Sequence, residues 1–313
     1  MTEAALDTPV AFLIFNRPEP TQAVFRRIAQ QRPQILLVVG DGPRPDRPGE
    51  AARVAAARAV IGQVDWPCRV LTCFSDINLG CKRRVSSGLD WVFAQVPEAV
   101  ILEDDCLPEP SFFAFCREML TRYRHDQRVG MISGDYFLRR GDAPATSYYF
   151  SRYVHIWGWA TWGDRWRDSY DVAMEAWTGP DRLAWLEGLL HHPSEAAAWA
   201  SIFDRVAKGE IDTWDFQWIY ANWRMGRIAV APSVNLISNI GFGPDATHTV
   251  QGSGLARLPT EPMAFPLRHP AEVAQARRQD RAEYRRLHST SLLDRLWRRL
   301  DRSLGRVRGN RHG

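Results

Sequence analysis

The stretch "AVILEDDCLPEPSFF", Ala99 to Phe113, places three consecutive carboxylates directly behind an apolar run. The aliphatic run Ala99–Leu102 has the composition of a buried strand. Glu103, Asp104 and Asp105 therefore fall at the end of that strand. Because like charges repel at such short range, we expect a cationic group among them.

Similar apolar runs and helical patterns alternate on both sides of this stretch. Strands are predicted at Val10–Phe15, Ile35–Val39, Arg69–Phe74 and Val129–Ser133, and helices at Thr21–Gln30, Glu50–Ile61, Lys82–Gln95 and Ser111–Tyr123. Strands that alternate with helices predict an α/β fold with a mostly parallel sheet flanked by helices. Ligands bind outside the carboxyl ends of such strands, so the segments after the first four strands are expected to form one rim.

The bulk composition is that of a globular protein. The chain has 313 residues, of which 45% are hydrophobic and 24% charged. Residues 1–9 lack a basic leader, and no stretch reaches the roughly 20 apolar residues of a membrane-spanning helix, so we expect a cytoplasmic protein. The five cysteines form no C-x-x-C pair, which argues against a disulfide framework or a structural zinc site.

The net charge of +4 is unevenly distributed along the chain. Residues 281–313 hold ten arginines against three acidic residues, a net charge of +7, which leaves −3 for the rest. A slightly acidic body is not typical of a nucleic-acid-binding domain, so we expect no nucleic-acid partner. In the tail, leucines and Trp297 form one stripe among arginines, which predicts a basic amphipathic helix on the inner, anionic membrane surface. A helix docked on the body or on a partner is the alternative.

The three carboxylates predict a site for a hard divalent cation. Oxygen ligands without a cluster of Cys or His suit Mn²⁺ or Mg²⁺, which completes its shell with substrate phosphates. Strand alternation places Glu103 and Asp105 on one side and Asp104 on the other. We expect Asp105 to bind the metal, Glu103 and Asp104 to contribute to nucleotide-sugar binding, and the cation to arrive with a nucleotide diphosphate; ordinary surface acidity is the alternative.

Other polar groups follow the neighbouring strands. Arg17 stands where a guanidinium could contact phosphate, although a solvated arginine at a helix start would look the same. Asp41, in the turn "GDGP", could accept a hydrogen bond from a base or ribose, or could serve the turn alone. Asn78 and Lys82 lie at the start of the next helix, where free N–H groups favour an anion, or where they form a simple capping loop.

The second half of the chain offers an acceptor side. "HIWGWATWGDRW", residues 155–166, contains Trp157, Trp159 and Trp162, whose flat rings suit a sugar face. A plain aromatic core is the alternative. Further on, apolar residues at helical spacing place Asp215, after Trp214, at a helix start, where an N-cap is the alternative to a catalytic role.

A glycine-containing loop, "SNIGFGPDATHT", spans residues 238–249 and ends near His248. Such a loop predicts a lid that orders over a ligand. We expect His248 near the diphosphate or the metal, with an ordinary surface histidine as the alternative.

The motifs "FNRP", "GDGP", "NLGCKR" and "ILEDDCLPEPSFFAF" together resemble GT-A glycosyltransferases, most closely those of the N-acetylglucosaminyltransferase I type. The chain also resembles bacterial proteins described as glycosyltransferases or as haemolysin-like. The resemblance covers residues 10–137 well and extends more loosely to residue 248. It implies a GT-A, Rossmann-like fold, a nucleotide-sugar donor that is usually UDP-linked, Mn²⁺, and inversion at the anomeric carbon.

Carried onto this chain, the resemblance assigns Asp105 to the metal, Asp41 to uracil and Arg17 to the diphosphate. Trp214 and Asp215 match a W-D element that holds the catalytic base in the family. The family's second Asp is replaced by a phenylalanine here, so Asp212 is the alternative base. The sequence diverges after residue 133, and the acceptor does not transfer.

These features together predict a metal-dependent inverting glycosyltransferase that acts on a glycan or a lipid-linked acceptor. Its expected units are a GT-A domain over residues 1–265, divided into a nucleotide-sugar-binding half (1–137) and an acceptor half with the lid (138–265), and a helical tail over 266–313. The alternatives are a nucleotidyltransferase acting on sugar phosphates and a non-catalytic carbohydrate-binding protein. A nucleotidyltransferase would more often carry a glycine-rich, lysine-bearing phosphate loop after its first strand, where this chain has "FNRPEP".

Overall fold

The computed structural model describes residues 5–138, 140–190, 192–241 and 257–287. In the first part of the chain, the predicted alternation of strands and helices is confirmed. The elements are β1 (Val10–Ile14), α1 (Pro18–Gln31), β2 (Ile35–Gly40), α2 (Glu50–Ala59), the 3₁₀ turn η1 (Val60–Gln63), β3 (Arg69–Phe74), α3 (Gly80–Gln95), β4 (Glu98–Glu103), α4 (Ser111–Tyr123) and β6 (Val129–Ser133).

The remaining elements were not predicted individually, apart from the helix that begins at Asp215. They are β5 (Cys106–Pro108), η2 (Arg140–Asp142), β7 (Tyr148–Ser151), β8 (Trp159–Trp162), α5 (Gly163–Arg167), α6 (Arg182–Leu190), α7 (Pro193–Ala207), α8 (Asp215–Arg224), β9 (Ile228–Pro232), β10 (Ile237–Asn239) and α9 (Arg277–Leu287).

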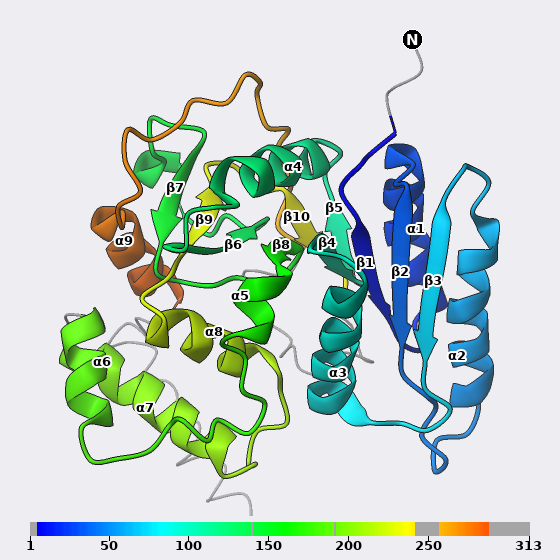
Figure 1. The fold of residues 1–313 in the computed structure, drawn as a ribbon, viewed down its shortest axis with the longest axis horizontal. Coiled ribbons are helices and arrows are strands. Elements are labelled where there is room, and N and C mark those ends of the chain that lie inside the picture. Colours follow the sequence, from blue (N-terminus) through cyan, green and yellow to red (C-terminus); the bar gives the residue numbers. More distant parts are fainter. Residues whose placement is uncertain (1–4, 139, 191, 242–256, 288–313) are drawn as a thin grey trace, which may run out of the picture.

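One eight-stranded sheet runs through the molecule in the order β3-β2-β1-β4-β8-β6-β9-β7, and β5 pairs with β10 in a separate ladder (Figure 1). The pairs from β3 to β4 are parallel, and β8 and β7 run against their neighbours. Six of the eight strands therefore share one direction. The predicted fold class, a Rossmann-like and mostly parallel sheet flanked by helices, is confirmed.

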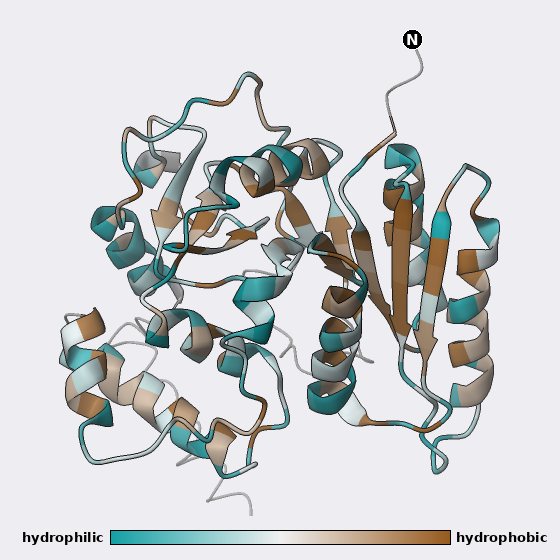
Figure 2. Cartoon of the chain, viewed as in Figure 1, coloured by the Kyte–Doolittle hydropathy of each residue, from teal (hydrophilic) through white to brown (hydrophobic). Residues whose placement is uncertain are grey.

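The central strands are apolar on both faces because helices cover both. Val10, Phe12 and Ile14 of β1 pack in a cluster with residues of α1, and Ala11 and Leu13 pack in a second cluster with residues of α3. Figure 2 shows β1 and β2 as almost continuously hydrophobic, whereas the edge strand β3 is mixed. This burial fixes the register of the sheet, and with it the positions of the loops at the strand ends.

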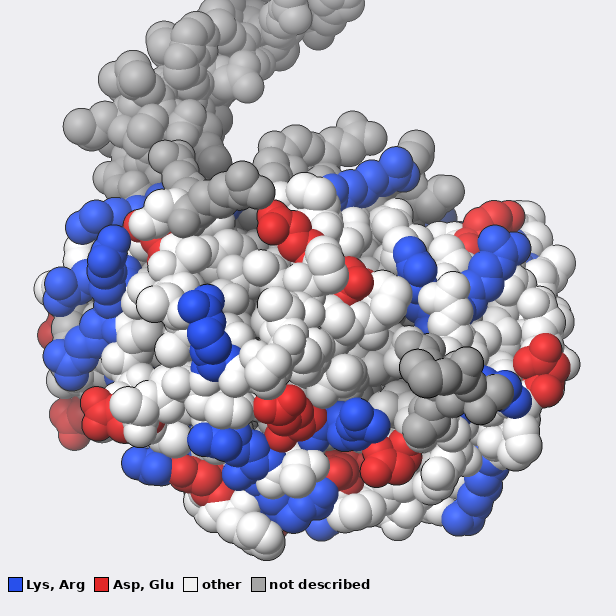
Figure 3. Space-filling view, turned by 90° about the horizontal axis from the view of Figure 1, so that it is seen from above, with Lys and Arg blue, Asp and Glu red and all other residues white. Residues whose placement is uncertain are grey.

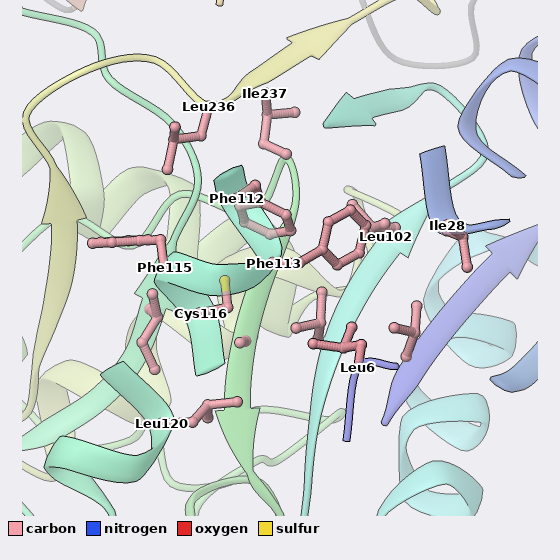
Figure 4. Close-up of a cluster of buried hydrophobic side chains, with 14 of the residues drawn as sticks. Leu6, Ile28, Leu102, Phe112, Phe113, Phe115, Cys116, Leu120, Leu236 and Ile237 are labelled. Atoms are coloured by element: carbon pink, nitrogen blue, oxygen red, sulfur yellow. The ribbon is translucent and has the colours of Figure 1, made fainter. Parts of the chain in front are cut away.

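Helix α4 fills the space between the first strands and the second half of the chain. Its residues Phe112, Phe113 and Phe115 are fully buried. In Figure 4 these rings lie with Leu102 of β4 and Ile237 of β10 in one apolar cluster. The helix therefore holds the end of β4, where the acidic triplet lies, against the second half of the chain.

The last described segment returns over the body of the protein. The backbone N–H of Arg268 donates to Ser147 Oγ at 2.9 Å, and α9 follows. Residues 288–313, which hold the predicted amphipathic helix, lie outside the described residues, and the division at residue 265 stays a prediction. Within the described ranges, no helix is both long and apolar enough to cross a membrane.

Charges of both signs are distributed over the surface. On the face in Figure 3, basic and acidic side chains are interspersed around the rim, and the middle is mostly uncharged. All five cysteines are free thiols.

Candidate functional site

A cavity of about 550 Å³ lies at the carboxyl ends of the first strands. Its wall includes residues that follow β1, β2, β3 and β4, as the parallel sheet predicts. The start of α8 and one residue of β10 complete it. Both halves of the chain therefore contribute to one site.

The acidic triplet is partly neutralised by a cation from the chain itself. Arg17 Nη1 donates to Asp105 Oδ2 at 2.8 Å, and Arg17 Nη2 donates to Asp104 Oδ1. Asp104 also accepts the backbone N–H of Phe15 at 3.2 Å, and the Cys106 thiol lies 3.5 Å from Asp105 Oδ1. Both aspartates are buried. The cationic group expected among the carboxylates is therefore, at least in part, Arg17.

The carboxyl group of Glu103 is not neutralised by Arg17, which pairs with the two aspartates only. Its carboxyl group lines the cavity and has no hydrogen-bond partner among the described residues. Burial raises the pKa of Glu103 to about 8, and the charges of Asp105 and Asp104 add to the effect. Burial also raises the pKa of Asp104 to about 6, although Arg17 opposes this shift. A further cation in the cavity would favour the charged form of both groups.

The described residues fit a divalent cation only in combination with other ligands. No group of three His, Cys, Asp or Glu side chains within the described ranges is arranged to hold a metal. Glu103 and Asp105 nevertheless offer carboxylate oxygens on the cavity wall. Mg²⁺ is commonly held by one or two carboxylates, with phosphates and waters completing its shell. The donor set therefore fits Mn²⁺ or Mg²⁺ brought in with a diphosphate.

Asp41 is buried, and its carboxylate is engaged by the chain itself. Its oxygens accept the backbone N–H groups of Gly42 at 2.9 Å, Leu79 at 2.9 Å and Gly80 at 3.0 Å, and the Asn78 amide at 3.0 Å. These contacts satisfy free N–H groups at the start of α3. Asp41 thus holds the loop before α3 in place, and its expected contact with a base stays a prediction.

The residues at the start of α3 divide into two groups. Asn78 lines the cavity, but Lys82 is not among the residues that line it. Arg84 lies on the cavity wall instead and was not singled out in the sequence. It stands four residues after Gly80, which also lines the cavity, so the helical repeat could have identified it.

The opposite wall is formed by the segment that leads into α8. Asp212, Thr213, Trp214 and Asp215 all line the cavity. Asp215 is the first residue of α8, as predicted. Its Oδ1 accepts the backbone N–H of Phe216 at 2.9 Å and the hydroxyl of Thr213, which leaves Oδ2 without a partner among the described residues.

The partly buried thiol of Cys81 lies close to carboxylates from both walls of the cavity. Burial raises the pKa of Cys81, and four nearby carboxylates raise it further. They are Glu103, Asp215, Asp212 and Asp41. Carboxylates of the acidic triplet and of the segment that leads into α8 therefore lie close enough to influence the same side chain.

The tryptophans separate into cavity and core residues. Trp157 and Trp214 line the cavity. Trp214 is only 2% exposed but contributes to that wall. Trp159 and Trp162, on β8, are 0% and 2% exposed and do not line the cavity, so the expectation that they contact an acceptor there is wrong. Trp159 stacks on Trp214 with ring centroids 5.7 Å apart, and Trp162 Nε1 donates to the carbonyl of Leu120 at 3.2 Å. Both are core residues that support the site.

The first residues of the predicted lid, 238–241, pass directly over the acidic triplet, and residues 238 and 239 belong to the strand β10 rather than to a loop. Gly241 donates its N–H to Asn239 Oδ1 at 2.9 Å. A Cβ atom on Gly241 would lie 2.0 Å from Asp105 Oδ2 and 2.8 Å from Arg17 Nη1, so no side chain fits there. His248 lies outside the described residues, and its place near the diphosphate stays a prediction.

No protein-family model matches the sequence, and no curated protein matches it. Among solved structures, the chain is similar to mouse xyloside xylosyltransferase 1 in its apo form, with a TM-score of 0.31 and 10% identity over 70% of this chain and 82% of that chain. It is also similar to UDP-glucose pyrophosphorylase complexed with UDP-glucose, with a TM-score of 0.31 and 8% identity over 72% of this chain and 90% of that chain. At these values neither likeness identifies a family or a function.

Proposed function

We propose that this protein is an inverting glycosyltransferase. It moves a sugar from a nucleotide-diphosphate donor, UDP-linked, to a hydroxyl group of a glycan or a lipid-linked acceptor. One observation carries the proposal: a single cavity joins the acidic triplet and Arg17 at the strand ends to the carboxylate of Asp215 at the start of α8. Such a cavity has a place for a diphosphate and a base beside it.

Arg17 is suited to bind the donor diphosphate. A guanidinium has five N–H donors, and only two contacts to carboxylates occupy it here. The remaining donors can contact phosphate oxygens while the triplet holds the side chain in place. Mn²⁺ or Mg²⁺ held by Asp105 and Glu103 would supply further positive charge for the departing diphosphate.

Asp215 is suited to act as the general base. Its Oδ1 is held by two donors, so its Oδ2 is the oxygen available to take the proton from an acceptor hydroxyl. The acceptor oxygen then bonds to the anomeric carbon as the bond to the diphosphate oxygen breaks, and the diphosphate leaves with that electron pair. One displacement inverts the carbon and requires no covalent enzyme intermediate.

The experiment that tests this function identifies the products formed from a panel of nucleotide sugars in the presence of Mn²⁺. A glycosyltransferase releases the nucleoside diphosphate, and the expected product from the preferred donor is UDP. Release of pyrophosphate would assign the protein to the nucleotidyltransferases instead. Unchanged donors across the panel would point to a non-catalytic carbohydrate-binding protein.

A further inference from the structure

Two loops beside the cavity are fixed against each other. The loop after β2 approaches the loop after β3 so closely that a Cβ atom on Gly42 would lie 2.5 Å from the backbone of Ile77. Arg58 Nη2 bridges them by donating to the carbonyl of Asp41 at 3.0 Å and to that of Ser75 at 2.6 Å. Side chains on the second loop are therefore presented to the cavity from a rigid support.

Asn78 has a single possible amide orientation on this support. Its Nδ2 donates to Asp41 Oδ2 at 3.0 Å and to the carbonyl of Gly42 at 2.8 Å. Both partners are acceptors, so a flipped amide would place its oxygen against two other oxygens. The Oδ1 atom of Asn78 has no partner among the described residues, and Asn78 lines the cavity. Asn78 therefore offers the cavity an acceptor of fixed direction.

Arg84 offers a donor on the wall of the same cavity. Its side chain is 8% exposed and lies near the carboxylate of Asp41, whose negative form it favours. Arg84 Nη2 donates to the carbonyl of Cys73 at 2.8 Å, while its buried Nε has no partner and its Nη1 makes no hydrogen bond to the described residues. A buried guanidinium with unused donors on a cavity wall is suited to bind a carbonyl oxygen of a ligand.

We propose that Asn78 selects the base of the donor: its Oδ1 accepts the imide N–H of uracil, and Arg84 donates to a carbonyl oxygen beside that N–H. Asp41 is then a positioning residue that fixes the Asn78 amide. The inference rests on the proposed function and names the residue that reads the nucleotide. Cytosine has a lone pair where uracil has the imide N–H, so in CDP two acceptors would face each other. Guanine also carries an N–H beside a carbonyl, so selection is between bases with and without that N–H.

Calorimetric titration with UDP and with CDP, each in the presence of Mn²⁺, tests this assignment. The wild-type protein is expected to bind UDP about 10- to 100-fold more tightly than CDP. The variant Asn78→Ala is expected to bind UDP more weakly and to bring the ratio of the two affinities toward one. Arg84→Met is expected to weaken UDP binding, and thermal melts of each variant establish that it is folded.

Asp76→Ala is the matched control, because Asp76 is exposed on the same loop and does not line the cavity. It should leave the ratio of UDP to CDP affinity unchanged. Equal affinities in the wild type, or an equal loss of both affinities in Asn78→Ala, would overturn the assignment of Asn78. Binding of neither nucleotide would overturn the proposed function itself, so the two failures are distinguishable.

Discussion

Arg17 largely determines the electrostatics of the site. It pairs with Asp104 and Asp105, so the charge that the sequence requires among these carboxylates comes from the first loop of the sheet. Glu103 is left without such a partner, and burial raises its pKa to about 8. The unbalanced carboxyl groups are the reason to expect a divalent cation there once a diphosphate binds.

The substitution Asp105→Ala tests that cation. We expect wild-type protein to bind UDP more tightly with Mn²⁺ than with a chelator, because the ion joins the carboxylate to the phosphates. In Asp105→Ala the two affinities, measured by calorimetry, should become similar. The exposed Asp76→Ala should behave like wild type. If wild-type protein binds UDP equally well with Mn²⁺ and with chelator, no metal ion takes part in binding the diphosphate.

The substitution Asp215→Asn tests the general base. Asn keeps an oxygen for the N–H of Phe216 but cannot take a proton from the acceptor. Sugar transfer should fall by about 10²- to 10⁴-fold while donor affinity stays near that of wild type. Both are measured on the same preparation, with thermal melts to establish folding.

Asp212→Asn is the comparison for that experiment, because Asp212 also lines the cavity but is exposed. We expect it to retain most of the transfer rate. Near-normal turnover in Asp215→Asn together with a large loss in Asp212→Asn would transfer the role of base to Asp212.

At the scale of elements, helix α9 docks through polar contacts. Asp280 accepts hydrogen bonds from Ser151 Oγ at 2.7 Å and from Gln275 Nε2 at 2.6 Å. Glu283 pairs with His155 at 2.5 Å. Both acids are almost fully buried, and the protonation of Asp280 affects how firmly the helix is held.

The stability of this docking should depend on pH. Burial raises the pKa of Asp280 to about 6, although its hydrogen bonds oppose the shift, and the unfolded chain titrates near 3.9. Between these values the folded protein binds the proton and the unfolded chain does not, so this group makes the free energy of unfolding decrease as pH rises from about 4 to about 6. Asp280→Asn removes the titration.

The measurement is urea unfolding of wild type and Asp280→Asn across that pH range. The wild-type free energy of unfolding should decrease relative to that of the variant by about 1–3 kcal/mol from pH 4 to pH 6. Glu272→Gln, at an exposed acid that precedes α9, keeps Asp280. The difference in free energy of unfolding between wild type and Glu272→Gln should therefore stay constant over this pH range. A difference between wild type and Asp280→Asn that stays constant with pH would contradict the buried titration.

The strands of the parallel sheet in the first half could be predicted from sequence, and the short strands of the second half could not. β1, β2 and β4 are continuous apolar runs between helical patterns, which is typical of a parallel sheet covered on both faces. β8 has only four residues, and "WATW" shows nothing of its pairing with β4. That pairing buries Trp159 and Trp162. From the sequence alone, the tryptophan-rich segment was equally consistent with a surface that binds a sugar ring.

The same distinction applies to the site. The convergence of four loops on one rim follows from the direction of parallel strands, so the sequence placed Arg17 and Asn78 beside the triplet. Asp215 was singled out by the resemblance and by its place at a helix start, and the structure brings it to the same cavity. The hydrogen bonds of the Asp41 carboxylate come in part from the N–H groups of Leu79 and Gly80, which are far away in sequence. Contacts of this kind arise only from the packing of one loop on another and have no local sequence signal.

At the scale of the whole molecule, one continuous sheet connects the two halves of the chain. β4 is the last strand of the parallel set, and β8 pairs with it in the opposite direction. The cavity lies where the loops of the first half meet the start of α8 and the end of β10. In the proposed reaction, one half would bind the donor and the other would take the proton, both at this single cavity.

Hydrogen exchange with and without UDP and Mn²⁺ measures most directly whether this cavity is the nucleotide site. We expect slower exchange in the four loops of the rim, residues 15–17, 40–44, 77–84 and 103–106, and in residues 212–215. Exchange in α6 and α7, which contribute no residue to the cavity wall, should not change. Protection confined to segments away from the rim, or no protection at saturating UDP and Mn²⁺, would contradict the assignment of the cavity as a nucleotide-sugar site.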